Sequence, residues 1–91
     1  MSAIRYRRHA DLRITSLEGE GVVLHLGERR YFSVNETGLT LLEAVLEPRT
    51  FEELVASLVA EYEVTEQEAE TTTRNFLEQC LASKVILEER G

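Results

Sequence analysis

The chain has 91 residues, of which 43% are hydrophobic and 30% charged, and its formal net charge is −7. A chain of this length forms one domain, residues 1–91, and buries only roughly 60–65% of its unfolded surface, so we expect function on the surface or in a groove. The sequence has no apolar run near the roughly 18 residues of a membrane span, no secretory signal and a single cysteine, which together predict a cytoplasmic protein that does not bind membranes.

Charge is divided unequally along the chain. Residues 1–34 carry six Arg against four Asp or Glu, whereas residues 35–91 carry four Lys or Arg against thirteen Glu. An acidic surface repels a phosphate backbone, so nucleic acid is not an expected partner. The glutamates either cover a solvated helix surface or attract a basic partner segment.

The first third of the chain favours strands. Three β-prone runs follow one another, Leu12–Leu17, Val22–Leu26 and Arg29–Val34, and Ile4–Arg8 precedes them as a short extended arm. Gly27-Glu28 has the Gly-X pattern of a two-residue type II′ hairpin turn. These runs predict an antiparallel meander whose last strand lies at a sheet edge next to the helices.

The rest of the chain favours three helices. Asn35 is placed to cap the first helix, which ends near Pro48 because the residue before proline disfavours the helical region. Capping boxes, with Thr at the cap and Glu three residues later, start the second helix at Thr50 and the third at Thr65. A final apolar run, residues 85–87, is too short for a helix and packs on the core or adds a strand. The sum is an α+β domain of winged helix-turn-helix type, a three-stranded antiparallel sheet followed by three helices.

Catalysis and metal binding have little support in the residues. His9 and His25 lie outside any triad-like motif, and two histidines with one cysteine match no zinc-ligand spacing. Cys80 lies on the apolar line of the third helix and is interpreted as a small buried hydrophobic residue. No glycine-rich phosphate loop occurs. We therefore expect no enzyme activity, no catalytic residue, no metal and no cofactor.

Several spaced segments resemble the PqqD-like family. They are Tyr31–Gly38 (YFSVNETG), Pro48–Val55, Leu58–Tyr62, Phe76-Leu77 and Lys84–Leu87. The similarity covers about residues 10–87, the expected core of the domain. The chain departs from the family pattern at Lys84, where the family often has Gly before the last apolar run. It departs again at Thr72-Thr73, where an acidic residue followed by Val is more usual.

The resemblance implies a winged-helix recognition element for precursor peptides of ribosomally made, modified natural products. It implies that the leader segment of the precursor adds a strand to the sheet and that the domain performs no chemistry itself. As a free-standing chain, the protein resembles the recognition proteins of lasso-peptide pathways, which present the precursor to a separate leader peptidase and a cyclase.

We expect the peptide to pair with the third strand beside the third helix. The predicted peptide-binding residues are Arg29, Arg30, Tyr31, Phe32, Ser33 and Val34 on the strand and Glu70, Arg74, Leu77, Glu78 and Leu81 on the helix. In this prediction the two leucines form an apolar wall, or else complete the core, and the two glutamates attract basic leader residues. The alternative is a winged-helix interaction or regulatory module that binds a folded protein or DNA.

Overall fold

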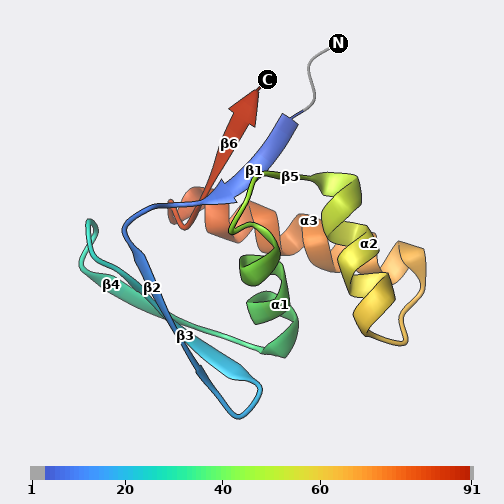
Figure 1. Cartoon of the computed structure of the whole chain (residues 1–91), viewed down its shortest axis with the longest axis horizontal. Coiled ribbons are helices and arrows are strands. Elements are labelled where there is room, and N and C mark those ends of the chain that lie inside the picture. Colours follow the sequence, from blue (N-terminus) through green and yellow to red (C-terminus); the bar gives the residue numbers. More distant parts are fainter. Residues whose placement is uncertain (1–3, 91) are drawn as a thin grey trace.

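The computed structural model describes residues 4–90, which form two three-stranded sheets and three helices (Figure 1). The elements in chain order are β1 (Ile4–Arg8), β2 (Leu12–Leu17), β3 (Glu20–His25), β4 (Arg30–Val34), α1 (Glu36–Ala44), β5 (Arg49–Thr50), α2 (Phe51–Glu61), α3 (Glu66–Ala82) and β6 (Ile86–Arg90). The predicted α+β class is confirmed, and a second sheet is added to it.

The predicted meander is present as an antiparallel sheet with the order β2-β3-β4. Its central row joins Ile14, Val23 and Phe32, and the face that carries this row packs on the hydrophobic core. The opposite face is exposed, so the strands alternate between core and solvent as a one-sided sheet requires. Within the described residues β4 pairs with β3 alone, which confirms the prediction that the last strand of the meander lies at a sheet edge.

The predicted tight turn between β3 and β4 is wrong. His25 pairs with Arg30, so a loop of four residues, 26–29, joins the strands. A type II′ turn needs a positive φ at its first central residue, and Gly27 does not have one. The positive φ in this loop belongs to its last residue, Arg29, at +54°, and β4 begins one residue later than predicted, at Arg30.

The second sheet, with the order β5-β1-β6, joins the two ends of the described chain. The segment predicted as an extended arm is β1, which pairs along its whole length with β6, from Ile4 opposite Arg90 to Arg8 opposite Ile86. The final apolar run therefore adds a strand, one of the two outcomes expected for it. The predicted single sheet of three strands did not include this second sheet, because its strands lie far apart in the sequence and β5 has only two residues.

The predicted helix starts are confirmed. The Asn35 side chain accepts the Gly38 N–H at 2.9 Å, and complete capping boxes begin at Thr50 and Thr65. The first helix is shorter than predicted, because α1 ends at Ala44 rather than near Pro48. The early end lets the Val45 carbonyl accept the N–H of Arg8 at 3.1 Å, which joins α1 to the second sheet.

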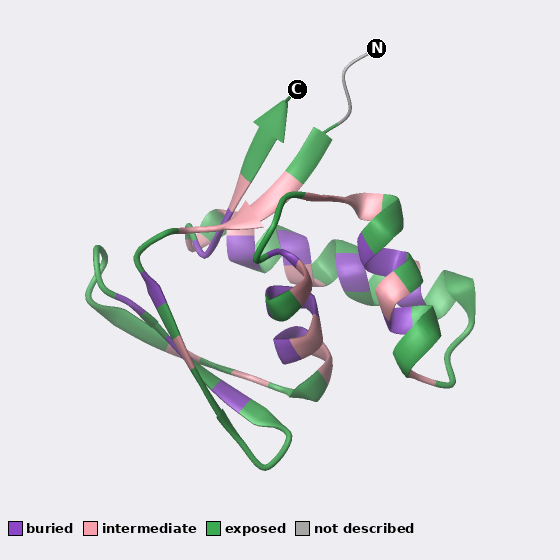
Figure 2. Cartoon of the chain, in the orientation of Figure 1, coloured by how far each residue is buried: buried purple, intermediate pink, exposed green. Residues whose placement is uncertain are grey.

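The hydrophobic core lies where the three helices meet the inner face of the β2-β3-β4 sheet (Figure 2). Its fully buried large apolar residues are Leu41, Leu42, Leu54, Leu58, Ile86, Val23 and Val45. The far ends of both sheets extend beyond this core and are largely exposed (Figure 2). No helix among the described residues is long and apolar enough to span a bilayer.

Candidate functional site

A groove runs between the open edge of β4 and one face of α3. Its main hollow has a volume of about 300 Å³. The residues that line it come from β4, the start of α1 and the middle of α3, and are Ser33, Val34, Asn35, Thr37, Gly38, Leu41, Thr72, Asn75, Phe76 and Gln79. At that volume the hollow is at the lower end of ligand sites, which span roughly 300–1,000 Å³, and suits a few side chains rather than a large ligand.

A second hollow, of about 120 Å³, continues the groove toward the end of α3. Four residues line both hollows, namely Ser33, Val34, Phe76 and Gln79. The continuation is bounded by Phe32 on the strand and by Cys80 and Ser83 on the helix. The two hollows therefore form one channel along β4, which we call the edge groove.

Close packing between α1 and α3 forms the floor of the edge groove. A Cβ added at Gly38 would lie 3.1 Å from the Phe76 ring and 3.3 Å from the Asn35 cap oxygen, so glycine lets the ring approach α1. The ring is half-buried and, with Val34, gives the floor its apolar character. The cap that starts α1 and the aromatic ring of α3 are thus coupled through one glycine.

The walls of the edge groove are uncharged. The polar residues that line it carry hydroxyls or amides and no charge, and are Ser33, Asn35, Thr37, Thr72, Asn75, Gln79 and Ser83. Burial raises the pKa of the Cys80 thiol to about 12, so this side chain stays protonated at neutral pH. An apolar floor between uncharged walls, next to an unpaired strand edge, is suited to an extended peptide with apolar side chains.

The six predicted strand residues divide between this groove and other surfaces. Phe32, Ser33 and Val34 line the edge groove. Arg29 lies in the hairpin loop, and the Arg30 guanidinium lies 5.5 Å from the Phe32 ring centroid. Tyr31 is 76% exposed on the outer sheet face, opposite Leu24.

None of the five predicted helix residues lines the edge groove. Leu77 is 4% exposed and belongs to the core, and Leu81 packs against it, so these leucines follow the alternative considered for them. The Arg74 guanidinium lies 5.6 Å from the Phe51 ring centroid, which directs it toward α2. At about 100° per residue, the stripe of Glu70, Arg74 and Glu78 lies on the side of α3 roughly opposite the groove.

The groove-lining stripe of α3 has a signal in the sequence. It consists of Thr72, Asn75, Phe76, Gln79 and Ser83, at helical spacing. All its polar members are uncharged, although they belong to the acidic half of the chain. The net charge summed over a segment of the chain does not reveal that one face of a helix is uncharged.

The residues considered for catalysis or metal binding include the buried His25. His25 is 2% exposed, and its ring nitrogens lie 3.2 Å from the Lys84 carbonyl oxygen and the Glu28 backbone nitrogen. Across residues 4–90 no group of three or more His, Cys, Asp or Glu side chains is arranged to hold a metal ion.

Comparison with solved structures gives two matches that cover most of this chain. The first is described as "TbiB1 in Complex with the TbiA(beta) Leader Peptide", with 25% identity, a TM-score of 0.78, and coverage of 88% of this chain and 93% of that chain. The second is described as "Lasso peptide synthetase B1 complexed with the leader peptide", with 18% identity, a TM-score of 0.75, and coverage of 90% and 96%. The second match supports the fold alone. Among curated proteins, none matches the chain.

A family model gives the remaining comparison. The model for coenzyme PQQ synthesis protein D matches residues 20–86, which include most of the β2-β3-β4 sheet, all three helices and both walls of the edge groove. The resemblance inferred from the spaced sequence segments is confirmed by this match. The chain is a member of the PqqD family.

Proposed function

We propose that this chain binds the leader segment of a ribosomally made precursor peptide and delivers it to separate processing enzymes, a leader peptidase and a cyclase. The leader adds a strand to the open edge of β4, inside the edge groove. The observation that carries the proposal is the unpaired β4 edge facing an uncharged stripe of α3 across an apolar floor. The solved neighbour with 25% identity contains a leader peptide, which supports the same ligand class here.

Strand addition places the leader side chains in two sets. Successive residues of a strand point to opposite faces of the sheet, so alternate leader residues face α3 and the others face outward. Phe32 and Val34 belong to the inner face of β4, and Tyr31 and Ser33 to the outer one. The leader residues that share the inner face enter the edge groove and contact Phe76.

Main-chain pairing alone gives little affinity. Each hydrogen bond contributes about 0.5–1.5 kcal/mol net, whereas ordering one peptide residue costs roughly 1–2 kcal/mol of backbone entropy. The affinity must therefore come from buried leader side chains, at about 1.5–3 kcal/mol each. Because no charged residue lines the groove, we expect two or three apolar leader residues to provide the affinity and the selectivity.

The test compares two exposed neighbours on α3 that face different sides. Gln79→Trp places a large ring in the groove, whereas Glu78→Trp places the same ring on the other side of the helix. We expect Gln79→Trp to weaken leader binding at least tenfold, about 1.4 kcal/mol, and Glu78→Trp to leave it unchanged. The measurement is a calorimetric titration of the whole chain with candidate leader peptides, with circular dichroism to show that both variants fold.

The reverse ranking would place the ligand on the face predicted from the sequence and contradict the edge groove. Leu77→Glu does not serve this test, because a charge at a 4% exposed core position unfolds the chain whatever the ligand does. Delivery needs a separate measurement, in which the rate of leader cleavage by the peptidase rises when the chain is added. An unchanged rate would leave leader binding in place and remove delivery.

A further inference from the structure

A second groove lies on α2 and shares no residue with the edge groove. It has a volume of about 360 Å³ and is lined by Glu52, Val55, Ala56, Val59, Ala60 and Glu66. Its lining residues on α2 follow helical spacing, so they form one stripe along the outer face of that helix. We call this surface the α2 groove.

The floor of the α2 groove is apolar and open to solvent. Val59 is 42% exposed, and Ala56 and Ala60 beside it are exposed as well. Two alanines one turn apart leave the helix backbone accessible to close approach, since packed helices lie about 8–10 Å apart depending on the side chains at the contact. The shape of this surface therefore suits the packing of another helix.

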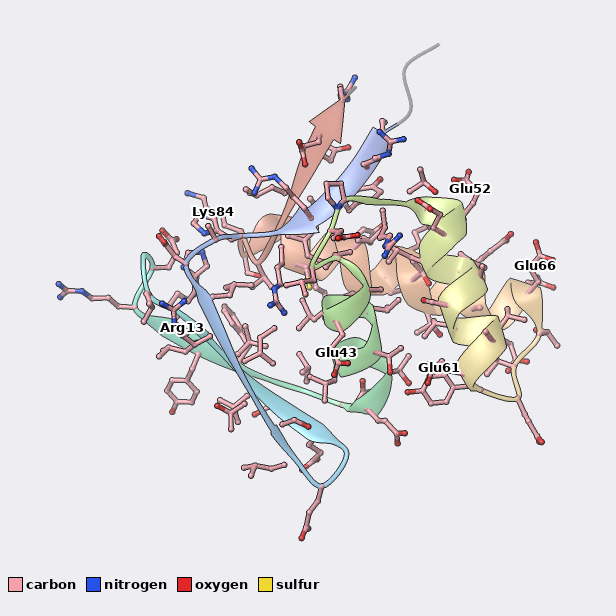
Figure 3. All side chains as sticks on the ribbon, in the orientation of Figure 1. Arg13, Glu43, Glu52, Glu61, Glu66 and Lys84 are labelled. Atoms are coloured by element: carbon pink, nitrogen blue, oxygen red, sulfur yellow. The ribbon has the colours of Figure 1, made fainter. Side chains whose placement is uncertain are left out.

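The rim of the α2 groove carries uncompensated negative charge. Residues 51–73 contain seven Glu and no Lys, Arg or His. Glu53 and Glu68 serve the two capping boxes, but Glu52 and Glu66, which line the groove, form no ion pair within residues 4–90. Figure 3 shows these two glutamates at the start of α2 and at the start of α3, away from the basic Arg13 and Lys84.

Glu52 and Glu66 lie in first turns, where the helix dipole favours an anion. Both residues also border the exposed apolar stripe of the α2 groove. Their carboxylates therefore stabilise the two helix starts and give the groove a negative border that suits a basic partner.

The occupant of the α2 groove must satisfy its own backbone. A strand needs an open edge to pair with, and the two elements that form this surface are helices, whose backbone groups bond internally. A helix brings its backbone bonds with it, and basic side chains on either flank match the acidic rim. A second copy of this acidic chain would bring like charges together instead.

We propose that the α2 groove is a docking surface for a basic amphipathic helix of a second protein. The small or apolar stripe of that helix lies on Ala56, Val59 and Ala60, and its Lys or Arg residues lie beside Glu52 and Glu66. Because the two grooves share no lining residue, peptide and protein bind at the same time. The proposal does not depend on what occupies the edge groove.

The probe for this proposal is a synthetic helix of about 18 residues, roughly five turns, with a Leu/Ala stripe flanked by lysines. The control peptide carries glutamates in place of the lysines. Titration of the isotope-labelled whole chain should shift the amides of Ala56, Val59 and Ala60 with the basic peptide only. Ser33, Asn75 and Gln79 in the edge groove should not respond.

Two variants separate a seated helix from general attraction to an acidic chain. Ala60→Arg adds bulk and positive charge to the floor and should weaken probe binding at least tenfold, about 1.4 kcal/mol. Glu43→Lys changes more charge at an exposed site on α1, outside the groove, and should have less than a twofold effect.

Equal weakening in Ala60→Arg and Glu43→Lys would show nonspecific attraction and overturn the proposal. Shifts confined to the edge groove, or no shifts on α2, would overturn it too. A sedimentation experiment in which the free chain forms a dimer and Ala60→Arg abolishes that dimer would also overturn the proposal, because the occupant would then be a second copy of the chain. Circular dichroism checks that both variants fold.

Discussion

The buried ring of His25 joins the β3–β4 hairpin to the turn after α3, with Nε2 3.2 Å from the carbonyl oxygen of Lys84. The Glu28 backbone N–H donates to Nδ1 at 3.2 Å, so the ring proton resides on Nε2 and is donated to the Lys84 carbonyl. One neutral side chain thus holds together the two elements whose separation sets the width of the edge groove.

Replacing this ring tests its role directly. His25→Phe keeps the bulk but leaves the Lys84 carbonyl and the Glu28 N–H without their partner. We expect a loss of about 1–3 kcal/mol in unfolding free energy, the cost of a buried polar group left unsatisfied, as measured by urea denaturation. His9→Phe is the control for ring packing, because the His9 ring lies 4.5 Å from the His25 ring at a tilt of 49°, and the hydrogen bond that it accepts from the Asp11 N–H is exposed. Equal losses in the two variants would assign the stability to ring packing instead.

The turn after α3 predicts a stabilising substitution. Lys84 has φ +62°, and the Val85 and Lys84 N–H groups donate to the Cys80 and Leu81 carbonyls at 2.8 and 3.3 Å, which makes a Schellman motif. A side chain in this left-handed conformation costs about 1–2 kcal/mol, so Lys84→Gly should raise the unfolding free energy by about 1 kcal/mol. Thermal denaturation measures the change, and Lys84→Ala, which keeps a Cβ, should show no such gain. A gain of equal size in both variants would rule out backbone strain as the cause.

The thiol of Cys80 should be unreactive in the folded chain. Burial raises its pKa to about 12, so almost no thiolate exists at pH 8. We expect a thiol reagent to label the native chain at least about tenfold more slowly than the chain unfolded in denaturant, as followed by mass spectrometry. Since Cys80 lies in the wall of the edge groove, a bound leader should slow the labelling further. Fast labelling of the native chain would show that the groove opens more widely than its geometry indicates.

The capping boxes predict a weakening in acid. The pKa of Glu68 lies below its ordinary value because the carboxylate accepts the Thr65 backbone N–H, and Glu53 is lowered in the same way by Thr50. A lowered folded-state pKa means that the contribution is complete above the unfolded-state pKa and is lost as pH falls through the folded value, from about pH 5 downward. Glu68→Gln keeps a hydrogen-bonding group but does not titrate.

The difference in unfolding free energy between the wild type and Glu68→Gln should therefore be largest near neutral pH and shrink in acid. Chemical denaturation at a series of pH values measures this difference. Glu43→Gln, which caps no helix, is the control and should show a smaller change with pH. A difference for Glu68→Gln that does not vary with pH would contradict the capping account.

Local signals in the sequence predicted local structure well. Asn35, Thr50 and Thr65 each place a polar oxygen beside free N–H groups, and each starts a helix where predicted. The family's frequent Gly at the position of Lys84 also has a local reason, because the chain needs a positive φ there. Lys84 satisfies the same geometry with a side chain, so this departure leaves the helix end intact.

The missed features depend on distant contacts. The β1–β6 pairing joins the two ends of the described chain, and the pattern within one short strand does not predict a partner so far away in the sequence. The groove face of α3 was predicted from the position of Leu77, whose burial was left open. The structure places Leu77 in the core, so this residue does not line the edge groove in which we propose that the peptide binds. The elements packed around α3 determine which of its faces is buried in the core and which lines the groove, and the sequence of the helix alone does not.

The open edge of β4 has a consequence for the protein in the absence of a ligand. Unpaired backbone groups on a strand edge accept any extended chain, including the same strand of another molecule in antiparallel alignment about a two-fold axis. Such self-pairing and guest binding use the same donors and acceptors, so they compete. If the chain pairs with itself in this way, the apparent affinity for a leader peptide would fall as the protein is concentrated, and dilute solutions would report the intrinsic value.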